Sequence, residues 1–170
     1  MALELLTYPH PLLNGQAKDI ESVDDEIRQL VAGMAETMYE NSGVGLAAPQ
    51  VGKLVRLIVY DLSGPTKRDD LRMLANPRIL AKSGEFESDE GCLSVPGIRG
   101  KIKRAEFVTV CGLGLDGQKI TFDADGLLAI CIQHEIDHLD GTLILNHFSR
   151  LKRSLYESKV KKWLKRKEAS

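Results

Sequence analysis

Hydrophobic residues first recur at helical spacing between residues 25 and 43. The apolar positions are Ile27, Leu30, Val31, Met34 and Met38. Steps of three and four residues place these side chains on one face of an amphipathic helix that packs on a core. Ser22 and Asp25 resemble a capping box at its start, and the helix is predicted to end near Gly43.

Two more helices are predicted in the last third of the chain. The segment from Gly126 to Asp140 is apolar on all sides, which is typical of a buried helix, with Asp125 as its cap and Gly141 as its stop. The third helix covers about residues 149–167 and carries Lys and Arg on most of its surface. Its apolar side is formed by Tyr156, Val160, Trp163 and Leu164.

Short runs rich in β-branched and aromatic residues predict strands between these helices. The runs are LVRLIVYDL (54–62), RMLANPRIL (72–80), GCLSVPG (91–97), EFVTVCGL (106–113) and KITFDAD (119–125). Residues 3–20 contain three Pro or Gly breakers and are predicted to form an irregular arm, and residues 43–52 to form a loop. Because strands and helices do not alternate, the pattern indicates an α+β fold rather than a doubly wound sheet.

The composition is that of a globular protein with an uneven charge distribution. The 170 residues are 43% hydrophobic and 28% charged, so we expect one domain over residues 1–170 with a substantial core. From Ser149 onward there are nine Lys and Arg against two Asp and Glu, which leaves 14 and 22 upstream. A basic tail on an acidic body favours an acidic partner for the tail.

The sequence also argues against two classes of protein. The start, MALELLTYPH, lacks the basic and apolar regions of a signal peptide, and no apolar run reaches membrane-spanning length. Three cysteines, an odd number, disfavour a disulfide framework and fit a reducing cytoplasm. We therefore expect a cytoplasmic protein that does not bind membranes.

The run CIQHEIDHLDG, from Cys131 to Gly141, contains the motif H-E-x-x-H as His134, Glu135 and His138. On a helix the two histidines lie about 40° apart around the axis and one turn from each other, which is the spacing of a metal-binding pair. Glu135 lies beside them, near enough to contact a water molecule at the metal. Catalytic metal sites normally have three protein ligands and an open position, so one ligand is missing from this motif.

Candidates for the third ligand stand on both sides of the motif. A zincin protease would take a downstream His or Glu, but His147 and Glu157 form no recognisable zincin pattern. Upstream, Cys92 follows Gly91, and a thiolate is a ligand for iron, zinc or cobalt. Cys131 could act as a fourth ligand, but a thiolate at the fourth position would close the site to water and substrate.

Three other polar residues have plainer interpretations. His10 and His147 lack neighbouring ligand residues and are predicted to be structural. Asp137 lies on the opposite flank of the helix and is either a partner for a ligand side chain or a solvated acid.

At this point the sequence resembles the peptide deformylases, which carry three motifs in a fixed order. The chain has GVGLAAPQ at residues 43–50, EGCLS at residues 90–94 and HEIDH at residues 134–138. The likeness runs from the N-terminal arm to the basic tail. The chain departs from many relatives at Asn14, where arginine is frequent, and at Gly100, where alanine is common. These differences affect packing rather than the motifs.

The resemblance implies an activity and a ligand set. It implies hydrolysis of the formyl group from N-formylmethionyl nascent peptides, with release of formate. Cys92, His134 and His138 would hold one divalent metal ion, Fe(II) in the cell, with Zn, Ni or Co as alternatives in prepared protein. Glu135 would act as base and then acid, while Gln50 and the Leu93 backbone N–H would stabilise the oxyanion.

The resemblance also implies a substrate cleft and a fold. The methionine side chain would lie against Val44, Ile130 and Cys131, and the peptide backbone would pair with Gly45 and Gly91, near Arg99. The expected α+β fold has mainly antiparallel sheets packed around the metal-binding helix, with a C-terminal helix. The basic tail suggests ribosomal RNA as a partner, while DNA is not expected.

Two other functions are compatible with the metal motif, whereas nucleotide binding by residues 43–48 is rejected. One is a zinc metallopeptidase with a different third ligand, and the other is a non-catalytic protein whose closed structural metal site includes Cys131. Residues 43–48 also match a loose dinucleotide fingerprint. That fingerprint needs the order strand, turn, helix, whereas the predicted order is helix, loop, strand.

Overall fold

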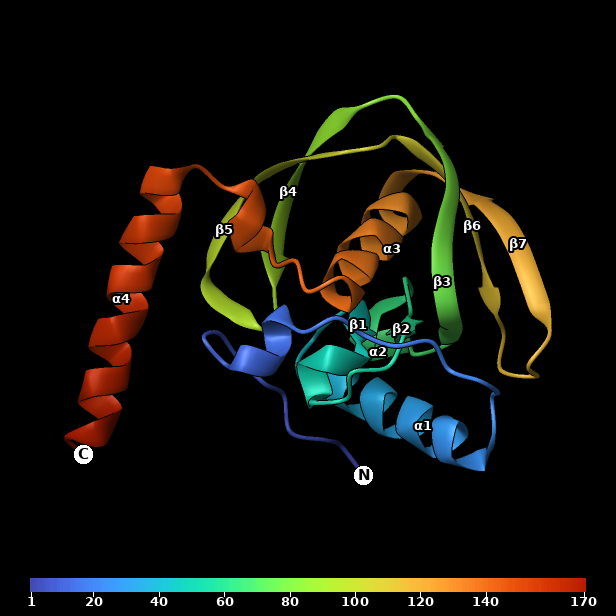
Figure 1. Ribbon diagram of the computed structural model, residues 1–170, viewed down its shortest axis with the longest axis horizontal. Helices are drawn as coiled ribbons and strands as arrows, with labels where there is room; N and C mark the ends of the chain where they lie inside the picture. Colours follow the sequence, from blue (N-terminus) through green and yellow to red (C-terminus); the bar gives the residue numbers. More distant parts are fainter.

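The computed structural model describes residues 1–170. In chain order the elements are η1 (Pro11–Asn14), α1 (Asp25–Glu40), β1 (Gly45–Ala47), η2 (Ala48–Val51), β2 (Leu57–Tyr60), α2 (Gly64–Lys67), β3 (Arg72–Ser83), β4 (Phe86–Cys92), β5 (Val95–Arg104), β6 (Phe107–Leu113), β7 (Lys119–Ala124), α3 (Gly126–Leu139), η3 (Ile144–His147) and α4 (Arg150–Glu168). Figure 1 shows α3 at the centre, with β4 and β5 on one side and β3, β6 and β7 on the other. α4 lies at the edge of the molecule, beyond β5.

The strands form two separate antiparallel sheets. Five strands pair in the order β1-β2-β3-β6-β7, and β4 pairs with β5 as a long hairpin. This arrangement confirms the predicted α+β fold with antiparallel sheets around a central helix. β1 is an edge strand, so one side of its backbone is not paired within the sheet.

Apolar side chains join the elements in three hydrophobic clusters. The first packs α1 against β1 to β3 and includes Met34 and Met38. The second packs α3 against the five-stranded sheet and includes Ile132. The third joins β5, η3 and α4 and includes Ile102 and Tyr156. Burial of these side chains stabilises the contacts that hold α3 between the two sheets.

The predicted helices are present, with small errors at their ends. The predicted capping box is wrong, because Asp24 caps α1 by accepting a 2.9 Å hydrogen bond from the N–H of Ile27. α3 agrees with the prediction and is followed by Gly141 at φ +76°, a conformation that glycine adopts readily. In α4, Tyr156 and Val160 are buried as predicted, but Leu164 is 41% exposed and does not belong to the buried side.

The predicted strands agree in three places and fail in one. Residues 72–80, 106–113 and 119–125 correspond to β3, β6 and β7, while residues 54–62 contain the shorter β2. Residues 91–97 were predicted to form a strand, but they contain the turn between β4 and β5. The predicted loop at residues 43–52 includes β1 and η2, because Gly45–Ala47 pairs with β2.

The N-terminal arm is held by backbone hydrogen bonds to distant segments. The N–H of Leu6 donates to the carbonyl of Gln50 at 2.8 Å, and the N–H of Tyr8 donates to the carbonyl of Ser94 at 2.7 Å. Further along, the N–H of Ala17 donates to the carbonyl of Leu139 at 2.9 Å. The arm therefore connects η2, the β4–β5 turn and the end of α3. No helix of the structure is both long enough and apolar enough to cross a membrane.

Candidate metal centre

Cys92, His134 and His138 converge on one point between β4 and α3. Cys92 is the last residue of β4, and both histidines lie on α3. One donor atom from each of the three residues lies within 4.8 Å of the others, and Cys92 Sγ is 3.3 Å from His138 Nε2. The docking of the β4–β5 hairpin on α3 thus brings together residues that are more than 40 positions apart in the sequence.

The environment of Cys92 favours the thiolate. Burial alone would raise the pKa of the thiol, but the charge of His138 and hydrogen bonds from His134 and His138 lower it to about 5. Burial lowers the pKa of His134, yet its hydrogen bonds to Cys92 and Glu90 raise it well above the ordinary value. The cluster therefore offers a thiolate, which is the form of cysteine that binds metals.

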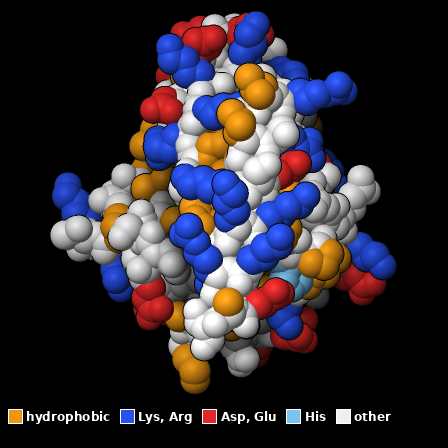
Figure 2. All heavy atoms as spheres, turned by 90° about the vertical axis from the view of Figure 1, so that its left-hand side faces the viewer, with side chains coloured by type: hydrophobic (Ala, Val, Ile, Leu, Met, Phe, Trp, Pro, Cys, Tyr) orange, Lys and Arg blue, Asp and Glu red, His pale blue; other side chains and the backbone are white.

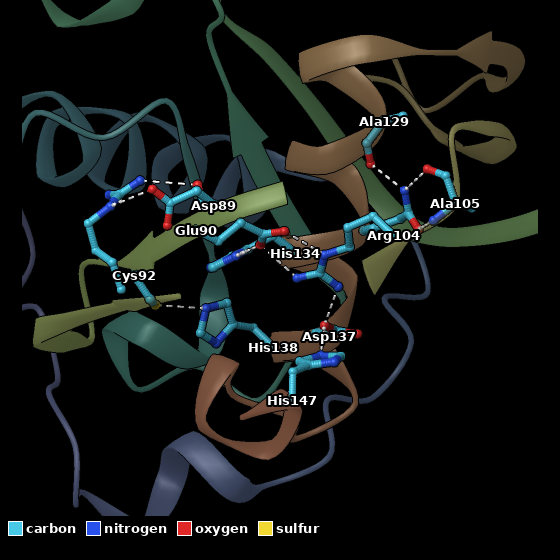
Figure 3. A network of polar contacts seen from close by, with 12 residues as sticks. Asp89, Glu90, Cys92, Arg104, Ala105, Ala129, His134, Asp137, His138 and His147 are labelled. Carbon is cyan, nitrogen blue, oxygen red and sulfur yellow. Dashed lines mark hydrogen bonds and ion pairs between the residues drawn. The ribbon is translucent and has the colours of Figure 1, made fainter. Parts of the chain in front are cut away.

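Glu90 orients His134 from the side opposite to Cys92. Its Oε1 lies 3.0 Å from His134 Nδ1. This contact, drawn as a dashed line in Figure 3, leaves Nε2 as the ring nitrogen that faces Cys92. Both carboxylate oxygens of Glu90 also accept 2.8 Å hydrogen bonds from the guanidinium of Arg104. Burial alone would raise the pKa of Glu90, but these partners lower it to about 2. Glu90 is therefore ionised and held in one orientation.

Arg104 extends this network along α3 to Asp137. Its Nη1 donates a 2.7 Å hydrogen bond to Asp137 Oδ2, which also lies 2.9 Å from His147 Nε2 (Figure 3). Arg104 and Glu90 have side chains only 4% and 6% exposed, so their charges neutralise each other inside the protein. Asp137 is thus a partner of Arg104 and contacts no ligand histidine directly. The predicted structural role of His147 agrees with its contact to Asp137.

Glu135 is buried beside the cluster without a hydrogen-bond partner for one oxygen. The residue is 5% exposed, and its Oε2 has no partner in the structure. Burial raises the pKa of the carboxyl, with Cys92 adding to this effect and the two histidines opposing it. A Cβ atom at Gly45 would lie 2.7 Å from Glu135 Oε1 and 2.8 Å from Cys131 Sγ. Glycine at position 45 therefore lets β1 pass close to the carboxylate.

Gln50 points its amide nitrogen toward Cys92. The Gln50 side-chain oxygen accepts a 2.9 Å hydrogen bond from the N–H of Ala47, which fixes which end of the amide faces the cluster. Its Nε2 donates to Ser94 Oγ at 3.1 Å and lies 3.7 Å from Cys92 Sγ. An amide donor is thereby held beside the ligand cluster. Leu93 lies between the two residues that Gln50 Nε2 approaches.

The cluster lies at the wall of a cleft of about 820 Å³. The residues predicted from the sequence that line it are Val44, Gly45, Gln50, Gly91, Cys92, Leu93, Arg99, Ile130, Cys131, His134 and Glu135. His138 is 1% exposed and lies behind this wall. Arg99 Nη2 donates a 3.1 Å hydrogen bond to the carbonyl of Asp89 across the hairpin, which leaves the guanidinium at the mouth of the cleft. The cleft has the size of a small-molecule or peptide site.

Cys131 lies apart from the ligand cluster. Its Sγ points toward the carbonyl of Val44 at 3.9 Å, and it does not belong to the group of converging ligand atoms. Burial raises the pKa of this thiol well above the ordinary value, and the charge of Glu135 adds to the effect. A protonated thiol is a poor metal ligand, so this geometry does not complete a closed four-ligand site.

The donor set fits a divalent metal of the transition series. It combines a thiolate with two imidazoles, a mixture suited to iron, zinc, cobalt or nickel rather than magnesium or calcium. The Glu90 contact holds His134 in the orientation that leaves Nε2 for a ligand bond. The third member of the converging group is Cys92, and the downstream residues His147 and Glu157 are not part of it.

The sequence alone did not reveal three residues that support the site. In the sequence Glu90 stands only as part of the motif EGCLS, and no pattern predicts a role for Arg104 or Ser94. A buried charge pair carries no periodic signal, because each member looks like an ordinary surface residue in the sequence. The one available hint was Glu90 at an inward-facing position of a strand, two residues before Cys92.

Sequence comparison places the chain among known proteins. The family model described as polypeptide deformylase matches residues 2–154. The peptide deformylase of Desulfosudis oleivorans is 48% identical over 164 residues, which cover 96% of this chain and 95% of that protein. The peptide deformylase of Neisseria gonorrhoeae is 49% identical over 160 residues, which cover 94% of this chain and 95% of that protein.

Solved structures agree with the sequence comparison. The crystal structure of a peptide deformylase from Legionella pneumophila matches with a TM-score of 0.91 and 41% identity, over 99% of this chain and 98% of that one. The peptide deformylase of Ehrlichia chaffeensis in complex with actinonin matches with a TM-score of 0.88 and 40% identity, over 95% of this chain and 96% of that one.

Proposed function

The chain belongs to the polypeptide deformylase family, and we propose that Cys92, His134 and His138 hold the single metal ion with which it removes the formyl group from N-formylmethionyl peptides. The observation that carries this assignment is the convergence of these three ligands beside the buried carboxylate of Glu135. A metal ion bound there supplies Lewis acidity, which makes water more acidic and polarises a carbonyl group.

Glu135 is the proton carrier in this proposal. Burial raises the pKa of its carboxyl above the ordinary value, which makes the carboxylate a stronger base toward a proton from water. Glu135 accepts a proton from the water molecule whose oxygen bonds to the formyl carbon. It then gives the proton to the amine as the carbon–nitrogen bond breaks, which leaves formate and a free N-terminus.

Gln50 and Leu93 stabilise the oxyanion that develops on the formyl oxygen. The hydrogen bond from Ala47 fixes the amide of Gln50, so Nε2 is directed toward the reaction centre before substrate arrives. The backbone N–H of Leu93, next to Cys92, is the second donor. Donors that are already oriented stabilise the transition state without the cost of reorganisation.

The peptide binds in extended form between β1 and the end of β4. β1 is an edge strand, so the backbone around Val44 and Gly45 can pair with an added strand. Gly91 offers a backbone group on the other side, and Arg99 at the cleft mouth faces the peptide carbonyls. The methionine side chain lies against Val44, Ile130 and Cys131, whose thiol stays protonated and apolar.

The same cleft explains discrimination between acyl groups. A formyl group carries only a hydrogen beyond its carbonyl, whereas an acetyl group carries a methyl. A single carbon added at Gly45 would already meet both Glu135 and Cys131, so this part of the cleft leaves little room for the methyl. A steric mismatch near the reacting carbon raises the barrier for the larger group.

The assay that tests this function measures formate released from formyl-Met-Ala by anaerobically prepared protein, with acetyl-Met-Ala as the control. Formate from the formyl peptide and no hydrolysis of the acetyl peptide is the expected result. A zinc metallopeptidase would instead cleave internal peptide bonds and keep its metal after Cys92→Ala, while a deformylase loses the metal. A structural metal protein would release no formate.

The metal in the cell is proposed to be Fe(II). Zinc binds a mixed sulfur and nitrogen site more tightly, but it commonly remains four-coordinate, whereas iron accepts a further ligand more readily. We expect the ferrous protein to turn over faster than the zinc protein and to lose activity in air, with cobalt or nickel protecting it. Rates of metal-free protein reloaded with each metal, normalised to bound metal, test this. A zinc form equal to the anaerobic ferrous form would exclude iron.

Residues 1–170 are proposed to form one domain in the cytoplasm. The three hydrophobic clusters each combine segments from distant parts of the sequence, so no cut separates the chain into two cores. The proposed substrates are nascent chains, which are formylated where translation takes place. This supports a cytoplasmic location.

The basic surface of α4 is proposed to bind ribosomal RNA. α4 carries nine Lys and Arg, and Figure 2 shows these side chains gathered along the helix. Binding through such a surface weakens with salt, because it releases counterions from the RNA. Deletion of the residues after Arg150 should reduce salt-dependent co-sedimentation with ribosomes and spare activity on short peptides. Unchanged co-sedimentation of a folded truncated protein would contradict the proposal.

A further inference from the structure

A second groove, of about 370 Å³, lies between β5 and the first half of α4. Its lining includes Gly97, Ile98, Leu151, Lys152, Leu155 and Lys159. None of them has been given a part in metal binding or in the reaction. The groove is open to solvent and has an apolar floor and basic borders.

The apolar wall of the groove is not needed for packing α4. Leu151 is 70% exposed and Leu155 is 64% exposed, although both are large aliphatic residues. They are four positions apart and so lie on the same face of the helix. Tyr156 and Val160, on another face, bury the helix against β5 and η3. Exposed aliphatic side chains that line a groove indicate a binding surface.

The borders of the groove carry positive charge that the protein does not neutralise. The Lys152 ammonium donates to the backbone carbonyl of Arg99, and the Lys159 ammonium lies 5.1 Å from the centroid of the Trp163 ring. The ion pair within α4 joins Arg153 and Glu157 instead. Figure 2 shows hydrophobic side chains toward the upper end of α4, with Lys and Arg side chains below them. The charge therefore favours an acidic occupant next to apolar side chains.

The groove is continuous with the metal cleft. Gly97 and Ile98 line both of them. Gly97 has φ +82°, and a Cβ atom there would lie 2.8 Å from the Trp163 ring, so the chain turns tightly under α4 at this point. Arg99 lines the cleft with its side chain, while its carbonyl is bound by Lys152 at the groove. A peptide that leaves the cleft past Arg99 therefore meets this groove next.

We propose that the groove between β5 and α4 binds the downstream residues of the substrate peptide and prefers apolar residues followed by acidic ones. The proposal rests on the proposed deformylase function. It adds a preference for particular residues of the substrate downstream of those that lie in the cleft. Leu151 and Leu155 contact the apolar side chains, and Lys159 attracts the carboxylates. Peptides too short to leave the cleft gain nothing from the groove.

The first experiment compares peptides that differ only downstream. Formyl-Met-Ala is followed by Gly-Ser spacers of increasing length and then by Leu-Leu-Glu-Glu or by Ser-Ser-Lys-Lys. We expect kcat/KM for the Leu-Leu-Glu-Glu series to exceed the other by about tenfold, mainly through KM, once the spacer is long enough. Equal kcat/KM for both series at every length would overturn the proposal.

The second experiment uses surface variants with matched controls on the same helix. Leu155→Ser should lower kcat/KM for the long Leu-Leu-Glu-Glu peptide by about fivefold. Lys159→Glu should reverse the preference in favour of Ser-Ser-Lys-Lys, an effect that salt weakens. Leu164→Ser and Lys167→Glu lie outside the groove and should change neither value. Equal effects of Leu155→Ser and Leu164→Ser would contradict a specific groove.

Three measurements separate the proposal from its alternatives. Activity on formyl-Met-Ala reports the deformylase function itself, so loss of that activity counts against the proposed function and not against the groove. Fluorescence polarisation of the labelled long peptide on metal-loaded Glu135→Gln protein measures groove binding without turnover. If sedimentation shows a dimer that Leu155→Ser dissociates, a second copy of the chain occupies the groove and the proposal is wrong.

Discussion

Glu90 Oε1 lies 3.0 Å from His134 Nδ1, and this contact decides which ring nitrogen of His134 faces Cys92. The carboxylate is fixed in turn by two hydrogen bonds from Arg104. The orientation of His134, a proposed metal ligand, is thus set by a charge pair buried behind it. The contacts of Glu90 with His134 and with Arg104 can be tested through metal binding and stability, without a measurement of turnover.

Glu90→Gln should weaken metal binding by about tenfold or more, because the neutral amide attracts His134 and Arg104 less strongly. Competition with a chelator for bound cobalt or zinc measures the affinity. Glu87→Gln is the matched control, since Glu87 lies on the same strand and its side chain is 59% exposed in a surface pair with Lys101. Equal affinities of the Glu90→Gln and wild-type proteins would show that the Glu90 carboxylate does not orient His134 for metal binding.

The stability of the metal-free protein should depend on the ionisation of Glu90. Its pKa in the folded protein is about 2, against 4.5 when unpaired. A folded pKa below the unfolded one stabilises the fold above pH 4.5, by about 3 kcal/mol for this shift, and the gain is lost as the pH falls toward 2. Urea unfolding at several pH values should show wild type and Glu90→Gln far apart at pH 7 and closer together at pH 3.

Glu135→Gln should retain the metal and lose turnover by about 100-fold or more, because the amide keeps the shape of the side chain but carries no proton between water and amine. Metal content by elemental analysis and formate release from formyl-Met-Ala are measured on the same sample. Near-normal turnover with the metal still bound would remove Glu135 from the reaction.

Gly45→Ala should lower kcat, by about tenfold to 100-fold, since the new methyl group would lie 2.7 Å from Glu135 Oε1 and must displace it. Gly114→Ala is the control, because the nearest side-chain atom there is 3.3 Å away and Gly114 does not line the cleft. Both variants should bind cobalt as the wild type does. An unchanged kcat for Gly45→Ala would mean that β1 can move away from Glu135 without any effect on the reaction.

Much of the fold was predictable where hydrophobic periodicity reports burial directly. The helix α1 and the strand β6 follow this rule, and His134 and His138 stand in a motif with fixed helical spacing. The β4–β5 hairpin did not, because Ser88, Glu90 and Arg104 occupy inward positions where a strand pattern normally has apolar residues. These buried polar residues support the site, and they also interrupt the apolar pattern from which β4 and β5 could have been predicted.

Smaller errors have local causes that the sequence does not contain. Asp24 rather than Ser22 caps α1. Both side chains can cap a helix, and the sequence does not show which of them the N-terminal arm places at the first turn. Leu164 continues the helical spacing of Tyr156 and Val160, but the ring beside Gly97 of β5 is that of Trp163, and Leu164 remains 41% exposed. Periodicity shows which face of a helix is apolar, and only the neighbouring elements decide how much of that face is buried.

The bonds of the N-terminal arm have a consequence for the order in which the molecule can be completed during translation. Leu6, Tyr8 and Ala17 leave the ribosome early, yet their backbone partners are Gln50, Ser94 and Leu139. The arm must therefore wait until residue 139 has emerged before its contacts can all form, and such long-range closure is slow compared with local helix formation. Gln50 and Ser94 also hold each other beside Cys92. The cleft is thus among the last regions to mature, so catalytic competence reports that nearly the whole chain has folded.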